Sequence, residues 1–260
     1  MTVRTGILAV IVGLLGLAVG ASDAPARRAT DQGGERRVAV EDHVYPWTSI
    51  GRINNSGRSF CTGVLIAPDR VLTAAHCLRS QVPGRAWAPP SAVHFLAGYR
   101  RGEYLAHSPA AAIAVAPAAP GEPARNADFA VVTLARPMTQ RVQPLAVESF
   151  DSARWLADRK AGVHYAQAGY SSDRAHILTG AGACRIAGFL RAGKLFAHSC
   201  EAIHGDSGSP ILVRRGNAYA VIGLHIASSR TGGRGLAISG ETLQRGLHRL
   251  AGTLPQSPKR

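Results

Sequence analysis

Residues 61–77 read CTGVLIAPDRVLTAAHC, two short apolar runs that are separated by a turn and enclosed by two cysteines. The runs contain Val, Ile and Thr, side chains that favour the extended conformation of a β-strand. Pro68 and Asp69, which lie between the runs, are typical turn residues. The stretch therefore predicts two β-strands with a turn between them.

The same pattern of short apolar runs recurs from Pro46 onward. Further runs of this kind are WTSIGRI, AVHFLAG, FAVVTLA, PILV, AYAVIGLHI and GLAIS. Turn residues separate them, and they do not alternate with helical segments as the strands of a parallel α/β sheet do. The sequence therefore predicts an all-β protein with a substantial core.

Two stretches depart from this pattern. Residues 107–128 are rich in Ala and Pro, and we expect one short strand there, 113–115, within a long surface connection. Residues 239–252 carry leucines at helical spacing and begin with Ser239, a favourable N-cap residue. They predict a C-terminal helix.

The N-terminus has the organisation of a secretory signal peptide. Arg4 supplies a positive n-region, residues 7–18 form an apolar h-region, and small residues follow. The apolar run is short for a membrane span, so we predict a signal peptide at residues 1–24, with an uncleaved anchor as the alternative. Residues 25–44 are expected to be disordered or propeptide-like, and the protein to be secreted or periplasmic, with no membrane span after signal cleavage.

The remaining chain is predicted to form two halves and a helix. A polar stretch at 148–160 is expected to connect the halves. The expected bounds are 45–147 for the first half, 161–238 for the second half and 239–252 for the C-terminal helix. We expect the protein to be a monomer.

Four cysteines, an even number, suit disulfides in an oxidising compartment. Three pairings are formally possible. We predict Cys61–Cys77 and Cys184–Cys200, because each pair is close in sequence and closing a loop of about 15 residues stabilises a fold by about 3 kcal/mol. No metal site is expected, since the sequence contains no CxxC or HxxxH spacing.

The formal net charge is +14, almost entirely from arginine. Such a field favours acidic surfaces and anionic substrates. The arginines are scattered and aromatic residues make up only 6% of the chain, so the basic stripe with stacking platforms that single-stranded nucleic acids require is missing. We therefore expect anionic surfaces among the partners and no specific nucleic-acid binding.

Three residues far apart in the sequence have the properties of a nucleophile and its helpers. His76 lies in VLTAAHC, where Cys77 would hold it in the rigid position that a general base requires. Asp128 precedes the run FAVVTLA and is either an acceptor for a histidine N–H or a cap of the strand. Ser207 lies in HGDSGSPIL, a glycine-rich turn that could equally be a hairpin corner.

Ser207 needs two kinds of help to react at neutral pH. Its hydroxyl has a high pKa and requires an adjacent base, for which His76 is the candidate. The negative charge that develops on an attacked carbonyl oxygen requires N–H donors, and the backbone N–H groups of Gly205 and Ser207 are the candidates. Gly208 leaves room for the backbone of this turn.

The stretches CTGVLIAPDRVLTAAHC, DFAVVTLARP and GDSGSP, in this order, resemble the three signature blocks of the chymotrypsin-like serine proteases. The resemblance implies two antiparallel six-stranded β-barrels packed face to face, with the active site in the cleft between them. It implies that His76, Asp128 and Ser207 hydrolyse peptide bonds in proteins or peptides through an acyl-enzyme intermediate. No metal or organic cofactor is required for this reaction.

The start of the mature chain departs from that of animal trypsins. In those relatives a new N-terminal amine pairs with the aspartate before the catalytic serine, which here is Asp206 and would brace the serine loop. The candidate start in this chain is RRVAVEDHVYPW, in which cleavage after Arg37 would free Val38. We expect a propeptide to be lost before Tyr45.

The expected specificity pocket carries two opposing signals. His225, in VIGLHIAS, resembles a histidine with which the secreted bacterial branch that includes the glutamyl endopeptidases binds an acidic side chain. Glu201 lies at the offset from Ser207 where trypsins carry the aspartate that selects basic side chains. Either residue could instead be structural, so the preferred substrate stays open. His204 lies at the expected rim of the pocket without an assigned role.

Two other functions are compatible with the same residues. A protease-like binding protein would use its basic surface to hold anionic cell envelopes, and an esterase could use the same scaffold. The complete set of candidate catalytic residues favours an exported serine endopeptidase.

Overall fold

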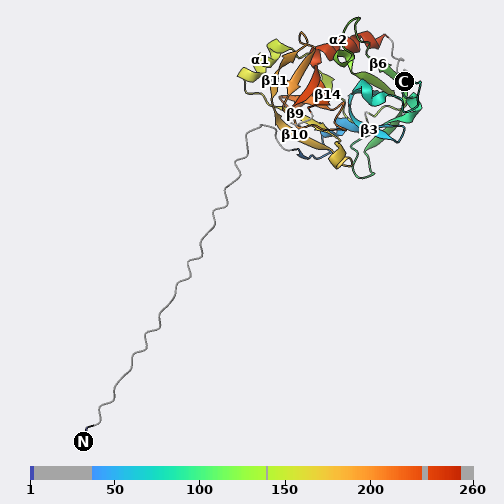
Figure 1. Cartoon of the computed structure of the whole chain (residues 1–260). Helices are drawn as coiled ribbons and strands as arrows, with labels where there is room; N and C mark the ends of the chain where they lie inside the picture. Colours follow the sequence, from blue (N-terminus) through green and yellow to red (C-terminus); the bar gives the residue numbers. More distant parts are fainter. Residues whose placement is uncertain (3–36, 139, 230–233, 253–260) are drawn as a thin grey trace. The chain divides into compact units, whose positions relative to one another are not determined.

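The computed structural model describes residues 1–2, 37–138, 140–229 and 234–252. Its described helices and strands all lie in one unit, Gln32–Arg260 (Figure 1). The predicted signal peptide, residues 1–24, lies outside the described residues from residue 3 onward. Among the helices that are described, none is long and apolar enough to cross a bilayer.

The first half of the fold is a closed antiparallel barrel. Its strands are β2 (Ile50–Asn55), β3 (Ser59–Ala67), β4 (Arg70–Thr73), β5 (Val93–Ala97), β6 (Ala106–Val115) and β7 (Ala130–Leu134). They pair in the order β2-β3-β4-β7-β6-β5, and β2 closes the ring by pairing with β5. Inward-facing residues such as Ile53, Leu65 and Phe95 are fully buried, so the barrel interior is a packed core.

The second half is a curled sheet of nine strands in the described chain. Its strands are β1 (Val38–Ala39), β8 (Ala146–Val147), β9 (Tyr165–Gly169), β10 (Thr179–Cys184), β11 (Ile186–Leu190), β12 (Leu195–His198), β13 (Pro210–Arg215), β14 (Ala218–Ser228) and β15 (Gly235–Ser239). The path runs β1-β10-β9-β13-β14-β15-β12-β11, and β8 pairs in parallel with β14. The protein is thus mostly β, as predicted.

This sheet differs from the closed six-stranded barrel that the resemblance implies. β10 pairs with β9, whereas β11, which follows β10 after Arg185, pairs with β12. The register of β10 against β9 shifts between Ala181 and Cys184, which interrupts this ladder of hydrogen bonds. The Cys184–Cys200 disulfide joins the end of β10 to the segment after β12 at this interruption.

β6 is longer than the strand that we expected at 113–115. It spans Ala106–Val115 and pairs with β5 on one side and β7 on the other. Alanine has a low β propensity and proline lacks an N–H donor, so the composition of this segment concealed the strand. Pairing on both sides holds the segment in the sheet despite Pro109.

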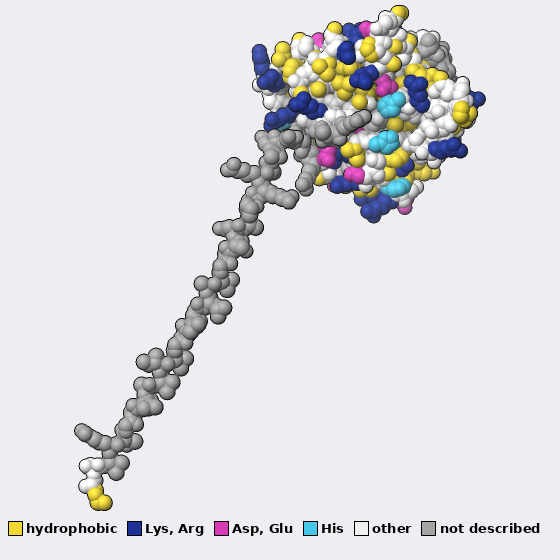
Figure 2. Space-filling model, viewed as in Figure 1, with side chains coloured by type: hydrophobic (Ala, Val, Ile, Leu, Met, Phe, Trp, Pro, Cys, Tyr) yellow, Lys and Arg dark blue, Asp and Glu magenta, His cyan; other side chains and the backbone are white. Residues whose placement is uncertain are grey.

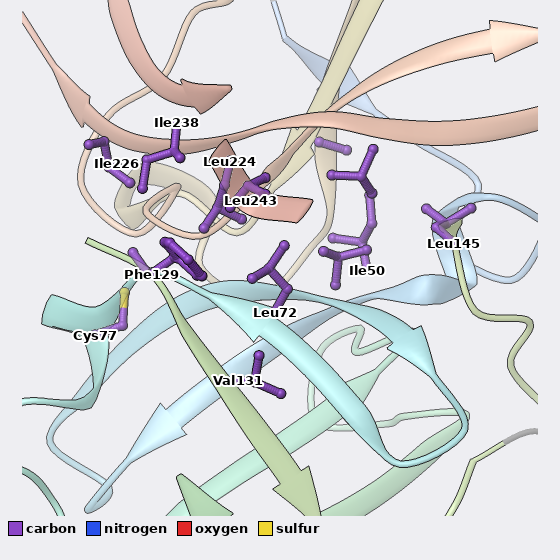
Figure 3. Packing of buried hydrophobic residues seen from close by; sticks show 14 of the residues in the cluster. Ile50, Leu72, Cys77, Phe129, Val131, Leu145, Leu224, Ile226, Ile238 and Leu243 are labelled. Atoms are coloured by element: carbon purple, nitrogen blue, oxygen red, sulfur yellow. The ribbon is translucent and has the colours of Figure 1, made fainter. Parts of the chain in front are cut away.

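One shared hydrophobic cluster packs the two halves against each other (Figure 3). The barrel contributes Leu72 and Phe129, and the second half contributes Leu224, Ile238 and Leu243, all at most 1% exposed. Burying one such side chain contributes about 1.5–3 kcal/mol. The cluster therefore sets the position of the loops of one half relative to those of the other.

The chain contains two α-helices among its described residues, α1 (Ser152–Lys160) and α2 (Gly240–Ala251). α2 is the predicted C-terminal helix, and the hydroxyl of its N-cap residue Ser239 accepts a backbone N–H of the first turn at 3.4 Å. α1 lies in the connection between the halves, where no helix was predicted, and Asp151 caps it. The short 3₁₀ helices are η1 (Trp47–Ser49), η2 (Ala75–Leu78), η3 (Pro90–Ala92), η4 (Ala124–Ala127) and η5 (Ser172–Arg174).

Candidate active site

His76 lies on η2, directly after β4 of the barrel. Ala74 before it is extended and fully buried, and Cys77 after it forms a disulfide with Cys61 of β3. The backbone N–H of Cys77 donates to the carbonyl of Ala74 at 3.1 Å. The backbone of His76 is therefore held to the barrel on both sides, while its side chain remains 40% exposed.

Asp128 lies between η4 and β7, at the rim of the barrel. Its Oδ1 accepts the backbone N–H of His76 at 2.9 Å, and its Oδ2 lies 2.7 Å from Nδ1 of the His76 ring. Because an ionised carboxylate can only accept, this contact favours a proton on Nδ1 and leaves Nε2 as an acceptor. The structure thus brings His76 and Asp128 together in the arrangement that orients a histidine base.

Ser207 lies in the loop between β12 and β13 of the second half. Its carbonyl accepts the N–H of Thr62 in β3 at 2.9 Å, and Sγ of Cys77 lies 3.8 Å from the same oxygen. The backbone of Ser207 therefore lies beside the disulfide next to His76. The Ser207 hydroxyl has no hydrogen-bond partner among the described residues, and catalytic hydrogen bonds are often long until substrate binds.

Gly208 lets the serine loop approach the barrel closely. Its φ is +82°, in the left-handed region that favours glycine, and a Cβ at this position would lie 2.2 Å from the carbonyl oxygen of Thr62. Its N–H donates to the carbonyl of His225 in β14 at 2.8 Å. The residue after Ser207 therefore contacts both halves of the fold.

Gly205 and Ser207 carry backbone N–H groups on either side of Asp206. Within the described part of the chain, neither N–H donates to an acceptor. The carbonyl of Gly205 accepts the Thr62 hydroxyl at 3.1 Å, which ties this part of the loop to β3. Donors without a protein acceptor, next to a candidate nucleophile, are what a developing oxyanion requires.

Residues 36–240 of the chain, well over half of it, match the family model Trypsin. The chain belongs to the trypsin family. A solved structure described as a Glu endopeptidase in complex with MPD has the same fold, with a TM-score of 0.67 and 19% identity over 85% of this chain and 99% of that chain. The protein is thus a serine endopeptidase of the chymotrypsin-like fold, and its substrates are proteins or peptides.

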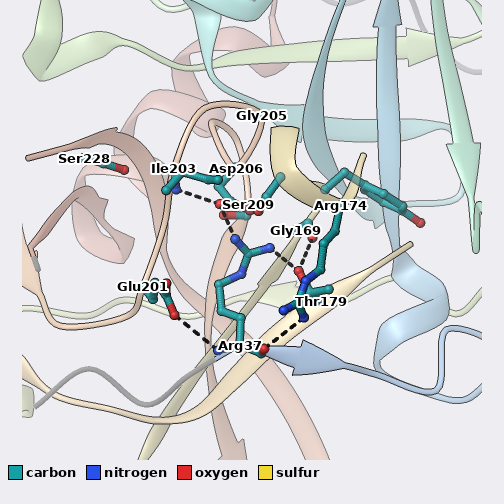
Figure 4. Close-up of polar contacts among 12 residues, drawn as sticks. Arg37, Gly169, Arg174, Thr179, Glu201, Ile203, Gly205, Asp206, Ser209 and Ser228 are labelled. Carbon is teal, nitrogen blue, oxygen red and sulfur yellow. Dashed lines mark hydrogen bonds and ion pairs between the residues drawn. The ribbon is translucent and has the colours of Figure 1, made fainter. Parts of the chain in front are cut away.

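Asp206 of this trypsin-family chain is a buried carboxylate, whose side chain is 2% exposed. Its Oδ2 accepts the Ser171 hydroxyl at 2.6 Å and the N–H of Ile203 at 2.9 Å, and it lies 3.0 Å from Nη1 of Arg37 (Figure 4). Burial raises the pKa of the Asp206 carboxyl, while the charge of Arg37 and the two hydrogen bonds lower it. Asp206 is therefore anchored from three directions directly before Ser207.

His225 lies on β14 and is 1% exposed. Its Nδ1 lies 3.0 Å from Nε2 of His198 in β12, and its Nε2 lies 3.1 Å from the Ser228 hydroxyl. Burial lowers the pKa of His198 to about 3, and burial together with the neighbouring His198 lowers the pKa of His225 well below its ordinary value. Both rings are therefore neutral near pH 7 and act through hydrogen bonds.

Glu201 and His204 are exposed. Oε2 of Glu201 accepts the backbone N–H of Arg37 at 3.4 Å, so this carboxylate faces the N-terminal segment. The carbonyl of His204 accepts the N–H of Ser172 at 2.8 Å, while its side chain forms no hydrogen bond, ion pair or ring contact with another described residue. The structure therefore gives the His204 side chain no partner among the described residues.

A cavity of about 330 Å³ lies beside His76 and Asp128. Two arginines line it: Arg79, whose guanidinium lies 5.0 Å from the centre of the Trp87 ring, and Arg125 of η4. Neither arginine forms an ion pair with a carboxylate in the described chain. The cavity therefore places two arginines without an ion-pair partner next to the candidate triad.

Cys61, His76 and Cys77 place candidate ligand atoms within 4.8 Å of one another. Both sulfur atoms belong to one disulfide, so neither cysteine offers a thiolate to a metal ion. The grouping follows from the disulfide next to His76.

Three residues of the site were not predicted from the sequence: Arg37, Thr62 and His198. Thr62 and His198 lie within strands, where a polar side chain on a buried face signals a specific hydrogen bond. Arg37 is one of several arginines near the N-terminus, and no local pattern distinguishes it as the partner of Asp206.

Proposed function

We propose that this protein is an exported serine endopeptidase in which His76, Asp128 and Ser207 form the catalytic triad. The observation that carries the proposal is the double contact of Asp128 with His76, beside the backbone of Ser207. It supplies an oriented base with Nε2 available, next to a serine on a tightly held loop.

The reaction proceeds in two halves. Ser207 Oγ attacks the scissile carbonyl carbon while His76 Nε2 takes the hydroxyl proton, and the N–H groups of Gly205 and Ser207 stabilise the oxyanion. His76 then gives the proton to the leaving amine, which departs and leaves an acyl group on Ser207. Water, deprotonated by His76, hydrolyses this ester and restores the enzyme. Asp128 keeps His76 in the required tautomer and stabilises the imidazolium.

The proposed preference is for an acidic side chain on the acyl side of the scissile bond. Three observations support it: the fold likeness to a Glu endopeptidase, the His225–Ser228 pair, and the net charge of +14. Glu201, the candidate for binding a basic side chain, instead accepts the Arg37 N–H. An acidic substrate therefore meets hydrogen-bond donors and a favourable field.

Export is supported by the two disulfides, because such bonds persist in oxidising compartments, and by the signal-peptide pattern of the N-terminus. On the face shown in Figure 2, lysine and arginine side chains are scattered over the surface and do not gather in one patch. This distribution favours diffuse attraction to anionic surfaces. The proposed location is secreted or periplasmic.

A fluorophosphonate probe tests the proposed triad. The processed wild-type protein should be labelled and should cleave peptides, Ser207→Ala should do neither, and Ser172→Ala, at an exposed serine, should behave as wild type. Failure of the folded, processed wild type to react would overturn the proposal in favour of a binding protein. A protein that is labelled by the probe and hydrolyses esters, but does not hydrolyse peptides, would be an esterase.

A peptide library tests the substrate preference. Peptides with Glu on the acyl side should be cleaved with at least about tenfold higher kcat/KM than the matched Lys peptides. Glu201→Gln should leave this ratio unchanged, because Glu201 contacts Arg37 in the folded protein. A preference for Lys or Arg that disappears in Glu201→Gln would refute the acidic preference.

A further inference from the structure

The ion pair between Arg37 and Asp206 lies directly before Ser207, at the loop that carries the candidate nucleophile. We propose that Arg37 is a built-in positioning residue whose guanidinium neutralises Asp206 and holds the loop of Ser207 in its working geometry. The active enzyme then retains Arg37, and hydrolysis of the bond between Arg37 and Val38 inactivates it. This inference rests on the proposed role of Ser207.

The buried carboxylate of Asp206 requires a counter-charge. Its side chain is 2% exposed, and a buried carboxylate without a counter-charge is strongly unfavourable. Ser171 and Ile203 donate hydrogen bonds to it, but both donors are neutral. Among the described residues, Arg37 is the one cation that forms an ion pair with Asp206. The ionised form of Asp206 therefore depends on Arg37.

Asp206 holds the loop of Ser207 through its backbone as well as its side chain. Its N–H donates to the carbonyl of Ile203 at 3.2 Å, and its carbonyl accepts the N–H of Ser209 at 2.9 Å. Its carboxylate also accepts the N–H of Ile203, so side chain and backbone together form a closed turn. The proposed oxyanion donors, Gly205 and Ser207, are the residues on either side. A shift of Asp206 would therefore move both donors.

Arg37 is itself held in place by hydrogen bonds of its side chain and its backbone. Its side chain is 8% exposed, and Nη2 donates to the hydroxyl of Thr179 (Figure 4). Its N–H donates to Glu201 at 3.4 Å, and its carbonyl accepts Nη1 of Arg174 at 3.2 Å. The residues that follow it form β1, which pairs with β10. Both the side chain and the backbone of Arg37 are thus built into the second half of the fold.

Cleavage after Arg37 would undo this arrangement. Water would supply the hydroxyl of a new carboxylate on Arg37 and a proton to the new amine of Val38, and the guanidinium would leave with the N-terminal fragment. Val38 lies in β1 opposite Gly180, with its side chain 61% exposed. The guanidinium, and not residue 38, occupies the space beside Asp206. The structure therefore favours a mature chain that begins at or before Arg37, and it opposes the activation after Arg37 that the sequence suggested.

The first test is the mass of the wild-type mature enzyme. The full-length chain is exported and processed by its own host, the active fraction is captured with a fluorophosphonate probe, and the captured protein is measured intact. We expect every active species to include Arg37. An active enzyme that begins at Val38 or later would overturn the inference, whatever the behaviour of variants.

The second test replaces the guanidinium. Arg37→Ala should lower kcat about 100-fold, the loss expected when an oxyanion donor is misplaced, with a smaller change in KM. Arg37→Lys should keep activity within about tenfold of wild type, because its ammonium still pairs with Asp206. Arg159→Ala, at an exposed arginine on α1, is the matched control and should be unchanged.

Chemical rescue separates positioning from general stabilisation. Millimolar guanidinium should raise the kcat of Arg37→Ala, whereas equal concentrations of sodium or tetramethylammonium chloride should not, and wild type should not respond. Full activity of Arg37→Ala without rescue would refute the inference while leaving the triad intact. Activity of Ser207→Ala would instead refute the proposed function. If Arg37→Ala does not accumulate, the mass of the mature enzyme decides alone.

Discussion

Asp128 contacts His76 twice, through Oδ1 to the backbone N–H at 2.9 Å and through Oδ2 to Nδ1 at 2.7 Å. The first contact fixes the position of the residue, and the second fixes its tautomer. Because His76 lies on η2 and Asp128 lies shortly before β7, both next to strands of one closed barrel, their separation does not depend on the second half of the fold. The second half then needs to supply only Ser207 and its N–H donors.

Asp128→Asn tests this relationship. The amide can donate to Nδ1 and stabilise the wrong tautomer, so kcat is expected to fall about 10³–10⁴-fold with little change in the melting temperature. Steady-state kinetics and thermal unfolding measure the two effects. Asp151→Asn, which keeps the cap of α1, is the matched control. A loss of activity below tenfold in Asp128→Asn would be inconsistent with the proposed triad.

Gly208→Ala tests the docking of the serine loop on β3. At φ +82° a Cβ would lie 2.2 Å from the Thr62 carbonyl oxygen, so the loop must shift. Since a displacement of about 1 Å can cost about 100-fold in rate, kcat should drop by about that factor. Gly216→Ala shares the positive φ but meets nothing within 4 Å, and should retain activity. Equal activity of the two variants would contradict the docking argument.

The two disulfides should differ in their effect on catalysis. Each has a sequence separation of 16, so removing either by a double Cys→Ser substitution should cost about 2–5 kcal/mol of unfolding free energy. Only the Cys61–Cys77 bond adjoins His76, so its loss should also lower kcat. Denaturant unfolding and kinetics on both double variants check this. An unchanged kcat without Cys61–Cys77 would show that the barrel alone holds His76.

The buried pair His198 and His225 should make the fold sensitive to acid. Burial depresses the pKa of His198 from 6.5 to about 3 in the folded protein, and that of His225 in the same direction. The unfolded chain binds these protons first, so the unfolding free energy should fall as the pH drops below about 6.5, by up to about 1.4 kcal/mol per pH unit for each histidine.

His198→Gln is expected to reduce this slope, because one of the two groups that gain a proton on unfolding is removed. Urea unfolding at a series of pH values between 4 and 8 measures it. His164→Gln, at an exposed histidine of the same half, should leave the slope as in wild type. The same pH slope in wild type and His198→Gln would refute the assignment of a neutral buried pair.

The cavity beside His76 is expected to select a second substrate side chain. Arg79 and Arg125 supply positive charge there, so peptides with an acidic residue at the position that fills the cavity should be favoured. Arg125→Glu should lower kcat/KM for those peptides about tenfold and raise it for their lysine counterparts. Arg136→Glu makes the same charge change away from the cavity and should alter both peptides equally. An unshifted profile in Arg125→Glu would exclude Arg125 from substrate selection.

Local pattern was sufficient to predict most strands and to propose the residues of the candidate triad. The short runs between Pro46 and Ser239 indicated β structure because apolar, β-branched segments between turn residues have few other stable conformations. The three blocks around His76, Asp128 and Ser207 indicated the family, which the match over residues 36–240 shows. The helix after Ser239 followed from a cap and a regular spacing of leucines.

Composition was misleading where tertiary contacts override local preference. β6 reads as a loop because it is rich in alanine and contains Pro109, yet pairing with β5 and β7 holds it in the barrel. The family resemblance implied a closed second barrel, but β10 pairs with β9 and β11 pairs with β12, so the hydrogen-bonded path stays open. In both cases the pairing between strands, and not the composition of one segment, decides the outcome.

The sequence by itself determined the all-β class and indicated the family and the candidate nucleophile, base and orienting carboxylate, since each motif consists of residues that are close together in the chain. Only the tertiary structure decided that Arg37 neutralises Asp206 and that His198 lies against His225. Such contacts join residues that are far apart in the sequence, and they exist only once the chain has folded. The physical reason is burial: a carboxylate or an imidazole acquires a required partner only when folding removes it from water.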